Sequence, residues 1–294
     1  MRPPNIPVAP ETRIIGPNLP SIASMPPDVT LVRASNPGPL TLEGTNTWVV
    51  GRDPAWVVDP GPLLDDHVEA VVDEVMRRGG LEGIVLTHDH ADHVEATQAF
   101  RLRAAEAWKR RRYGDDVRGR ANLVPIFAGR GEVDVVIGDG DPAGPFTALL
   151  TAGHSPDHLA YVLDDVAFTG DAVLGSGSVF VATSLGTYLD ALRRLRALGV
   201  RTLYPGHGPV VEDGQAKLDQ YLEHRLDRER KLVAALDDGR RTSDELLDAA
   251  WDDAPAELRP VAAISLAAHL DKLQQEGRLP DRVERPEVPD WSGP

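Results

Sequence analysis

A dense cluster of histidine and aspartate side chains lies in the middle of the chain. Three histidines and two aspartates fall within the seven residues Thr87-His88-Asp89-His90-Ala91-Asp92-His93. Neutral imidazole and carboxylate groups are the donors that a borderline divalent metal such as zinc prefers. So many donors in one turn exceed what a single closed structural site needs, and the spacing therefore indicates a pair of metal ions. Solvated histidines at a polar helix start are the alternative, which this density disfavours.

The segments around the cluster predict that it lies at the end of a strand. The apolar run 83–86 comes just before it and is typical of a buried strand, and residues 91–100 have helix-forming composition. Ligands bind at such strand-to-helix turns in open α/β sheets. His154, Asp171 and His207 also follow apolar, strand-like runs and stand next to glycine. We therefore expect these three residues on loops that face the same edge as the cluster.

The combined pattern resembles the metallo-β-lactamase superfamily. The motif His-x-His-x-Asp-His at 88–93 is followed by the distant His154, Asp171 and His207, and Asp59 in the run Val-Val-Asp-Pro-Gly matches the family's first motif. Further segments, at 36–39, 44–47, 153–158 and 204–209, resemble the β-lactamase-like protein 2 group of this superfamily. The known animal member of that group is a mitochondrial endoribonuclease, and fungal enzymes of the group release polyketides from carrier-protein thioesters.

The resemblance implies a role for each of these residues. One metal ion would be held by His88, His90 and His154, the other by Asp92, His93 and His207, and Asp171 would bridge them. Two divalent ions about 3.5–4 Å apart can share one carboxylate and lower the pKa of a water, so no protein nucleophile is needed. Zinc is expected, with manganese or iron as alternatives. Asp59 is expected to orient a histidine ligand or the metal loop, and Asp59 and Asp92 are candidate catalytic residues.

Three further residues are candidates for substrate contact. His158 could bind a phosphate or protonate a leaving group, and could equally be a packing histidine. Asn46 lies on a predicted strand near the motifs. Residues 101–120 hold eight basic and three acidic side chains, a local net charge of +5, and Arg111 lies in their densest part. This charge run is either a solvated helix-loop excursion or an electrostatic lip near the active site for an anionic substrate.

The composition sets broad limits on function. The 294 residues carry a formal charge of -15 and include no cysteine. Disulfides, thiolate zinc sites and cysteine nucleophiles are therefore excluded, and a long nucleic-acid-binding surface is disfavoured. The start of the chain lacks the apolar stretch of a signal peptide, and no run of 18 apolar residues occurs, which predicts a cytoplasmic protein without membrane contact. Arginine far outnumbers lysine, which suggests a GC-rich bacterial genome. The oligomeric state is left open.

The order of elements predicts an α+β protein with three parts. Residues 1–27 are rich in proline and are expected to form an extended arm. Residues 28–213 alternate strands and helices, for which the resemblance implies a four-layer αββα metallo-β-lactamase sandwich. Residues 214–294 change to helices, one of them opened by a capping box at Thr242-x-x-Glu245, and resemble a winged-helix-like C-terminal domain. This last part carries 12 basic and 18 acidic residues, a net charge of -6, so we expect a packing or substrate-shaping role rather than binding of duplex DNA.

These observations predict a dinuclear metal-dependent hydrolase. RNA phosphodiesters, with single-stranded RNA as the candidate form, are the first substrate hypothesis, which rests on the resemblance and on the basic run. A thioester, ester or lactone, such as a carrier-protein thioester, is the alternative, because the same ligand set serves both chemistries. A nucleic-acid-binding regulator with a vestigial site is disfavoured by the complete set of seven ligands. A true β-lactamase is not expected, since there is no secretion signal and the C-terminal domain is extra.

Overall fold

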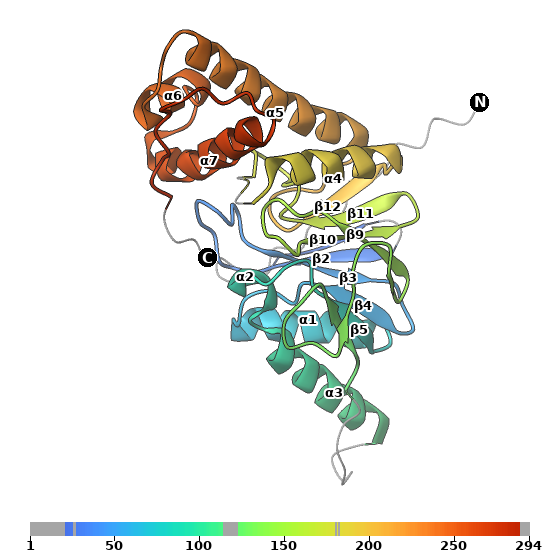
Figure 1. Cartoon of the computed structure of the whole chain (residues 1–294). Coiled ribbons are helices and arrows are strands. Elements are labelled where there is room, and N and C mark those ends of the chain that lie inside the picture. Colours follow the sequence, from blue (N-terminus) through green and yellow to red (C-terminus); the bar gives the residue numbers. More distant parts are fainter. Residues whose placement is uncertain (1–20, 26–27, 114–122, 180, 182, 289–294) are drawn as a thin grey trace, which may run out of the picture. The chain divides into compact units, whose positions relative to one another are not determined.

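The computed structural model describes residues 28–113, 123–179, 181 and 183–288, together with the backbone of residues 21–25. The chain divides into two compact units, the first formed by residues 1–127 with 133–135 and the second by residues 128–132 with 136–294. One β-sheet forms the centre of each unit, and helices accompany both sheets (Figure 1). The predicted α+β class is confirmed.

The sheet of the first unit has the strand order β1-β2-β3-β4-β5-β6-β7. The first four strands pair antiparallel: β1 (Ser21–Met25), β2 (Val29–Arg33), β3 (Asn46–Val50) and β4 (Ala55–Val58). The next two pair parallel to their predecessors and β7 ends the order: β5 (Leu81–Val85), β6 (Ile126–Ala128) and β7 (Val135–Val136). Parallel neighbours need long crossovers, which are supplied by α1 (Asp65–Arg77), α2 (Ala91–Val94) and α3 (Thr97–Tyr113).

The parallel strands β4 and β5 end on the same side of the sheet, and the histidine motif follows the end of β5. Val58 is in register with Val85, and the Asp59 amide donates to the Val85 carbonyl at 3.0 Å. Asp59 has a φ of 52°, a left-handed conformation that aspartate adopts more readily than most residues. Residues 86–90 leave β5 at this same edge and lead into α2. The sheet thus places Asp59 beside the motif.

The sheet of the second unit has the strand order β12-β11-β10-β9-β8. Its strands are β8 (Pro142–Ala143), β9 (Phe146–Leu150), β10 (Leu159–Leu163), β11 (Val166–Gly170) and β12 (Thr202–Pro205). β10 is antiparallel to both β9 and β11, and β12 is parallel to β11 with α4 (Leu185–Ala197) as the crossover. The strands β9, β11 and β12 therefore run in one direction, and the loops that follow them carry His154, Asp171 and His207 at one edge, as predicted.

Four helices complete the second unit: α5 (Gly214–Asp237), α6 (Ser243–Ala250), the 3-10 turn η1 (Ala256–Leu258) and α7 (Arg259–Gln275) (Figure 1). The predicted capping box of Thr242 and Glu245 is present at the start of α6. Leu218 and Tyr221 of α5 are buried in one cluster with α4 and the sheet, whereas Leu232 and Leu236 are buried among α6 and α7. The two halves of α5 therefore belong to two different apolar cores.

Two sequence-based expectations change in detail. Within the expected arm of residues 1–27, the segment 21–25 is a strand that pairs with β2, and residues 1–20 and 26–27 lie outside the described part of the chain. The expected excursion after residue 100 is a continuous helix as far as Tyr113, and residues 114–122 are again outside the described part. The domain boundaries after residues 27 and 213 stay predictions. None of the helices in the described ranges combines the length and apolar character needed to cross a membrane.

Candidate metal centre

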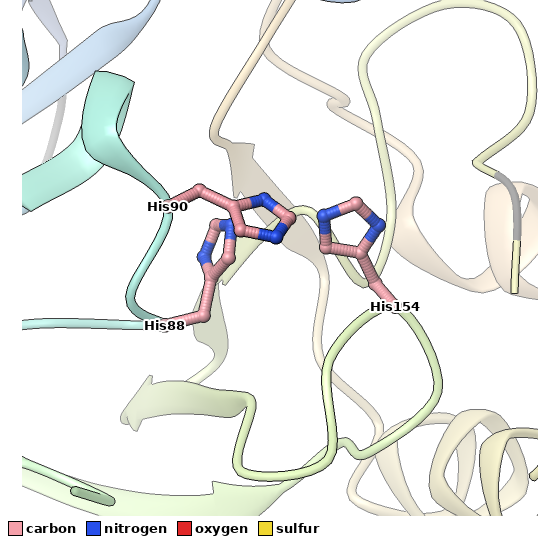
Figure 2. A group of neighbouring side chains, drawn as sticks. All are labelled: His88, His90 and His154. Atoms are coloured by element: carbon pink, nitrogen blue, oxygen red, sulfur yellow. The ribbon is translucent and has the colours of Figure 1, made fainter. Parts of the chain in front are cut away.

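The seven predicted ligands are all buried, with exposed fractions of 8% or less: His88, His90, Asp92, His93, His154, Asp171 and His207. Their donor atoms form three groups, each within 4.8 Å: His88 with His90 and His154, His88 with His93 and Asp171, and Asp92 with His93 and His207. Figure 2 shows the first group. Neighbouring groups share a histidine, as two adjoining metal sites would. Imidazole and carboxylate donors in these numbers fit a divalent ion.

The two carboxylate oxygens of Asp171 face two different histidines. Oδ2 lies 3.6 Å from His154 Nε2, and Oδ1 lies 3.5 Å from His207 Nε2. Both separations are long for hydrogen bonds. They match two ligands of one ion, because donor atoms about 2.0–2.2 Å from a metal at a tetrahedral angle stand about 3.4 Å apart. Asp171 is therefore placed as a carboxylate that bridges two ions would be.

Asp59 orients two of the histidines from one buried carboxylate. Its Oδ1 accepts the Thr87 amide at 2.8 Å, and its Oδ2 accepts the Thr87 hydroxyl at 2.7 Å and lies 2.9 Å from His93 Nδ1. A carboxylate at this position favours the His93 tautomer with a proton on Nδ1, which leaves the Nε2 lone pair for a metal. Because the Thr87 hydroxyl donates to Asp59, its oxygen is an acceptor for His88 Nδ1 at 2.9 Å. His88 Nε2 is thus also left as a donor to a metal.

Asp92 is oriented by a second set of polar side chains, which sequence reasoning missed. The Thr45 hydroxyl donates to Asp92 Oδ2 at 2.8 Å. Thr45 is held in turn by Asn36, whose amide group donates to the Thr45 hydroxyl and accepts the Thr45 amide, both at 2.9 Å. Both residues lie in segments that were noted only for their family resemblance. The only local indication of this support was that Asn36 and Thr45 are polar residues next to glycine or proline in predicted turns.

For His158 the structure favours the packing alternative over a substrate contact. The ring is fully buried, with Nδ1 2.8 Å from the Thr151 hydroxyl and Nε2 accepting the Asp171 amide at 3.0 Å. An imidazole that accepts at Nε2 is neutral and carries its proton on Nδ1. Both nitrogens are therefore engaged by protein groups, and His158 supports the backbone of Asp171 instead of meeting a substrate or protonating a leaving group.

Asn46 also has a structural position. It is the first residue of β3, is fully buried, and accepts the Arg33 Nε proton at 2.9 Å. Its neighbour Thr45 donates to the predicted ligand Asp92. The contact with Arg33 joins the end of β2 to the start of β3, and a substrate contact from Asn46 stays a prediction.

Arg111 lies at the wrong end of the first sheet for a substrate contact. Its guanidinium donates to the Met76 carbonyl in the last turn of α1, which precedes β5, whereas the histidine motif follows β5. The helix explains this position: α3 begins at Thr97 beside the motif, and fourteen residues carry the chain about 21 Å along the helix axis. Figure 1 shows α3 leading away from α2. An electrostatic lip that includes Arg111 is therefore not formed near the predicted ligands.

The three remaining histidines are not members of the donor groups. His67 on α1 contacts the Pro60 carbonyl and the Thr47 hydroxyl, both at 3.0 Å, and burial lowers its pKa to about 4. His269 on α7 lies 2.8 Å from the Ser265 carbonyl, and burial lowers its pKa to about 4 as well. His224 on α5 also has a pKa lowered to about 4, mainly by burial. All three are neutral near pH 7.

Comparison with known proteins identifies both parts of the chain. Residues 40–207 match the metallo-beta-lactamase superfamily, and residues 242–282 match the beta-lactamase associated winged helix domain. A Caenorhabditis elegans protein named beta-lactamase-like protein 2 homolog is 31% identical over 260 residues, covering 85% of this chain and 85% of that protein. An Aspergillus fumigatus protein named atrochrysone carboxyl ACP thioesterase is 32% identical over 265 residues, covering 82% of this chain and 79% of that protein.

A solved structure shows the same fold. The crystal structure of a beta-lactamase domain protein from Burkholderia ambifaria superposes with a TM-score of 0.68 at 16% identity, covering 87% of this chain and 89% of that one. The predicted fold, with its winged-helix-like C-terminal part, is confirmed by these matches. With histidine and aspartate donors at its strand ends and both sequence matches in place, the chain belongs to the metallo-β-lactamase superfamily of hydrolases and carries the winged-helix domain associated with it.

Proposed function

We propose that this protein is a dinuclear metal-dependent hydrolase that cleaves acyl thioesters. The observation that carries the proposal is the set of three overlapping donor groups, with Asp171 facing a histidine on each of its carboxylate oxygens. We assign His88, His90 and His154 to one ion, Asp92, His93 and His207 to the other, and Asp171 to both. Zinc is the ion that this mixed imidazole and carboxylate set suits best, and manganese or iron can replace it.

Two observations favour a thioester over RNA. The A. fumigatus relative, similar over most of its length, is named a thioesterase that acts on an acyl carrier protein (ACP). Within the described residues, the basic run that favoured RNA lies along α3, and Arg111 there is bound to the end of α1. A chain of net charge -15 is a poor match for a phosphate backbone. An acyl group carried on a protein or on a small thiol is therefore the proposed substrate class.

The side chains of the site have defined tasks in this hydrolysis. When bound, the two metal ions supply Lewis-acid polarisation of the scissile carbonyl and activate water at neutral pH. Asp59 holds the Nδ1 proton of His93 and, through Thr87, sets His88, so that both rings present Nε2. Thr45 fixes the carboxylate of Asp92, which we assign to orienting the attacking water. The chain has no cysteine, so acyl transfer to a side-chain thiol is excluded.

The test compares two substrates on one preparation. Zinc-loaded protein is incubated with a small acyl thioester and a chromogenic thiol reagent, and separately with end-labelled single-stranded RNA. Because the protein contains no cysteine, every thiol that the reagent detects comes from the substrate. His93→Ala protein prepared in the same way is the control for contaminating enzymes.

We expect the wild-type protein to release thiol, the His93→Ala variant to release none, and the RNA to stay intact. Cleavage of RNA by the wild-type protein alone, without thiol release, would replace the thioester by a phosphodiester as the substrate. Equal thiol release by both proteins would assign the activity to a contaminant and remove support for the proposal.

A further inference from the structure

The segment that follows Asp171 is held at several points by helices of the second unit. Asp171 is the first residue after β11, and residues 172–174 continue from it as a fully or nearly fully buried stretch. Val173 and Leu174 share one apolar cluster with side chains of α4 and α5. The position of the bridging carboxylate therefore depends on what these two helices contact.

Tyr188 on α4 contacts the backbone beside two of the proposed ligands. Its hydroxyl donates to the Ala172 carbonyl at 2.6 Å, one residue after Asp171. Its ring lies directly against Gly153, one residue before His154, because a Cβ atom built at Gly153 would come within 2.4 Å of the tyrosine ring. One fully buried side chain thus fixes the spacing between the two loops that carry Asp171 and His154.

Tyr221 on α5 adds a second contact to the same segment. Its hydroxyl accepts the Leu174 amide at 3.0 Å, three residues after Asp171. Burial raises the pKa of Tyr221 to about 12 and raises the pKa of Tyr188 as well, so both phenols keep their protons at every pH at which the protein would work. Both hydroxyls are therefore constant hydrogen-bonding partners.

Arg225, one turn further along α5, connects these contacts. Its buried guanidinium donates to the Val179 carbonyl and to the Ser178 hydroxyl, and lies 5.7 Å from the centre of the Tyr188 ring. Among the described residues it has no carboxylate partner. A buried cation without a counter-ion is costly unless its protons are bound, so this arginine holds the carbonyl and ring that surround it.

We propose that α5, the first helix after the last proposed ligand, positions the metal centre: Tyr221 and Arg225 on α5, together with Tyr188 on α4, set the place of Asp171 and His154. The proposal rests on the metal centre of the proposed function and does not depend on the substrate. It gives the start of the C-terminal helical region a task in metal binding. Removing a side chain that orients a ligand typically weakens metal affinity 10- to 100-fold.

The test removes single oxygen atoms. Tyr188→Phe and Tyr221→Phe keep the buried rings and delete only the hydrogen bonds to the Ala172 carbonyl and the Leu174 amide. The control is Leu247→Ala, which opens a cavity in the apolar cluster of α5, α6 and α7 and contacts neither ligand loop. Metal affinity is measured by competition with a chromophoric chelator, and the visible absorption spectrum of the cobalt-loaded protein reports ligand geometry. Thermal unfolding is recorded for every variant.

We expect each phenylalanine variant to bind at least one ion about tenfold more weakly and to show a changed cobalt spectrum. Leu247→Ala should lower the melting temperature while keeping the wild-type affinity and spectrum. Wild-type affinity and spectrum in both phenylalanine variants would overturn the proposal, and so would an equal loss of affinity in the control, since the effect would then follow stability alone. Normal metal binding without thiol release from any thioester would refute the proposed substrate and leave this inference standing.

Discussion

At the scale of single residues, the Asp59 carboxylate supports the proposed site. It accepts three hydrogen bonds from Thr87 and His93 and is 1% exposed. An asparagine in its place would present an amide group to at least one of these donors. We expect Asp59→Asn to weaken metal affinity about 10- to 100-fold, measured by chelator competition. Asp165→Asn, which removes an exposed ion pair with Arg201, is the control, and an equal effect in both variants would contradict the assignment.

Thr45 offers a milder test at the same scale. Thr45→Val keeps the shape of the side chain and removes the hydroxyl that donates to Asp92. We expect about a tenfold loss in kcat/KM for thioester hydrolysis, because the carboxylate is no longer held in place. The control Thr147→Val changes an exposed threonine on β9 and should leave kcat/KM within twofold. Unchanged kinetics in Thr45→Val would show that Asp92 needs no support from this hydroxyl.

Single residues also show where sequence reasoning stops. The donors at 88–93, His154, Asp171 and His207 could be named because each follows a strand-like run, and strand ends gather at one sheet edge. The supporting roles of Thr45 and His158 depend on hydrogen bonds to residues 47 and 13 positions away, which no local pattern reveals. Motif spacing and strand-like runs could therefore supply the ligand candidates but not the side chains that orient them.

At the scale of elements, the length of α3 determines how far Arg111 of the basic run lies from the histidine motif. The sequence favours a helix after the motif, and local composition does not show that it continues to Tyr113. Because each helical residue advances the chain by about 1.5 Å, a continuous helix carries Arg111 away from the motif, whereas a short helix with a returning loop would not. Arg111 therefore takes no part in a lip near the motif, and residues 114–120 of the basic run lie outside the described part of the chain.

Helices α1 and α7 each carry a buried neutral histidine, and this makes the fold sensitive to acid. Burial lowers the pKa of His67 and of His269 from 6.5 to about 4. Between these pH values the unfolded chain binds more protons than the folded one. The free energy of unfolding therefore keeps its full value above pH 6.5. It falls as the pH drops toward 4, by up to about 3 kcal/mol for each histidine.

The test for this acid sensitivity is urea unfolding at pH 7, 6 and 5. A His269→Phe variant cannot titrate at this position, so its free energy of unfolding should fall less steeply with pH than that of the wild type. The difference between the two slopes gives the contribution of His269 to the pH dependence of the free energy of unfolding. Identical slopes would mean that burial does not keep this imidazole neutral.

At the scale of the whole molecule, we expect metal binding and folding to be coupled. The seven proposed ligands lie on the turn after β5 and on the loops after β9, β11 and β12, and all are buried. An ion that binds only the folded chain stabilises it by about 2.7 kcal/mol when its concentration is 100 times the dissociation constant. We expect removal of metal by a chelator to lower the melting temperature by several degrees and re-addition of zinc to restore it. An unchanged melting temperature would contradict binding at these buried donors.

The proposed hydrolytic centre depends on Asp171 as the bridge between two ions, and this bridge can be tested by metal content together with activity. Wild-type protein and Asp171→Ala protein are loaded with zinc, desalted and analysed for bound metal and for thiol release from a small acyl thioester. We expect two ions per chain and hydrolysis for the wild type, and at most one ion with nearly complete loss of hydrolysis for the variant. Two ions and full activity in Asp171→Ala would contradict the bridging role.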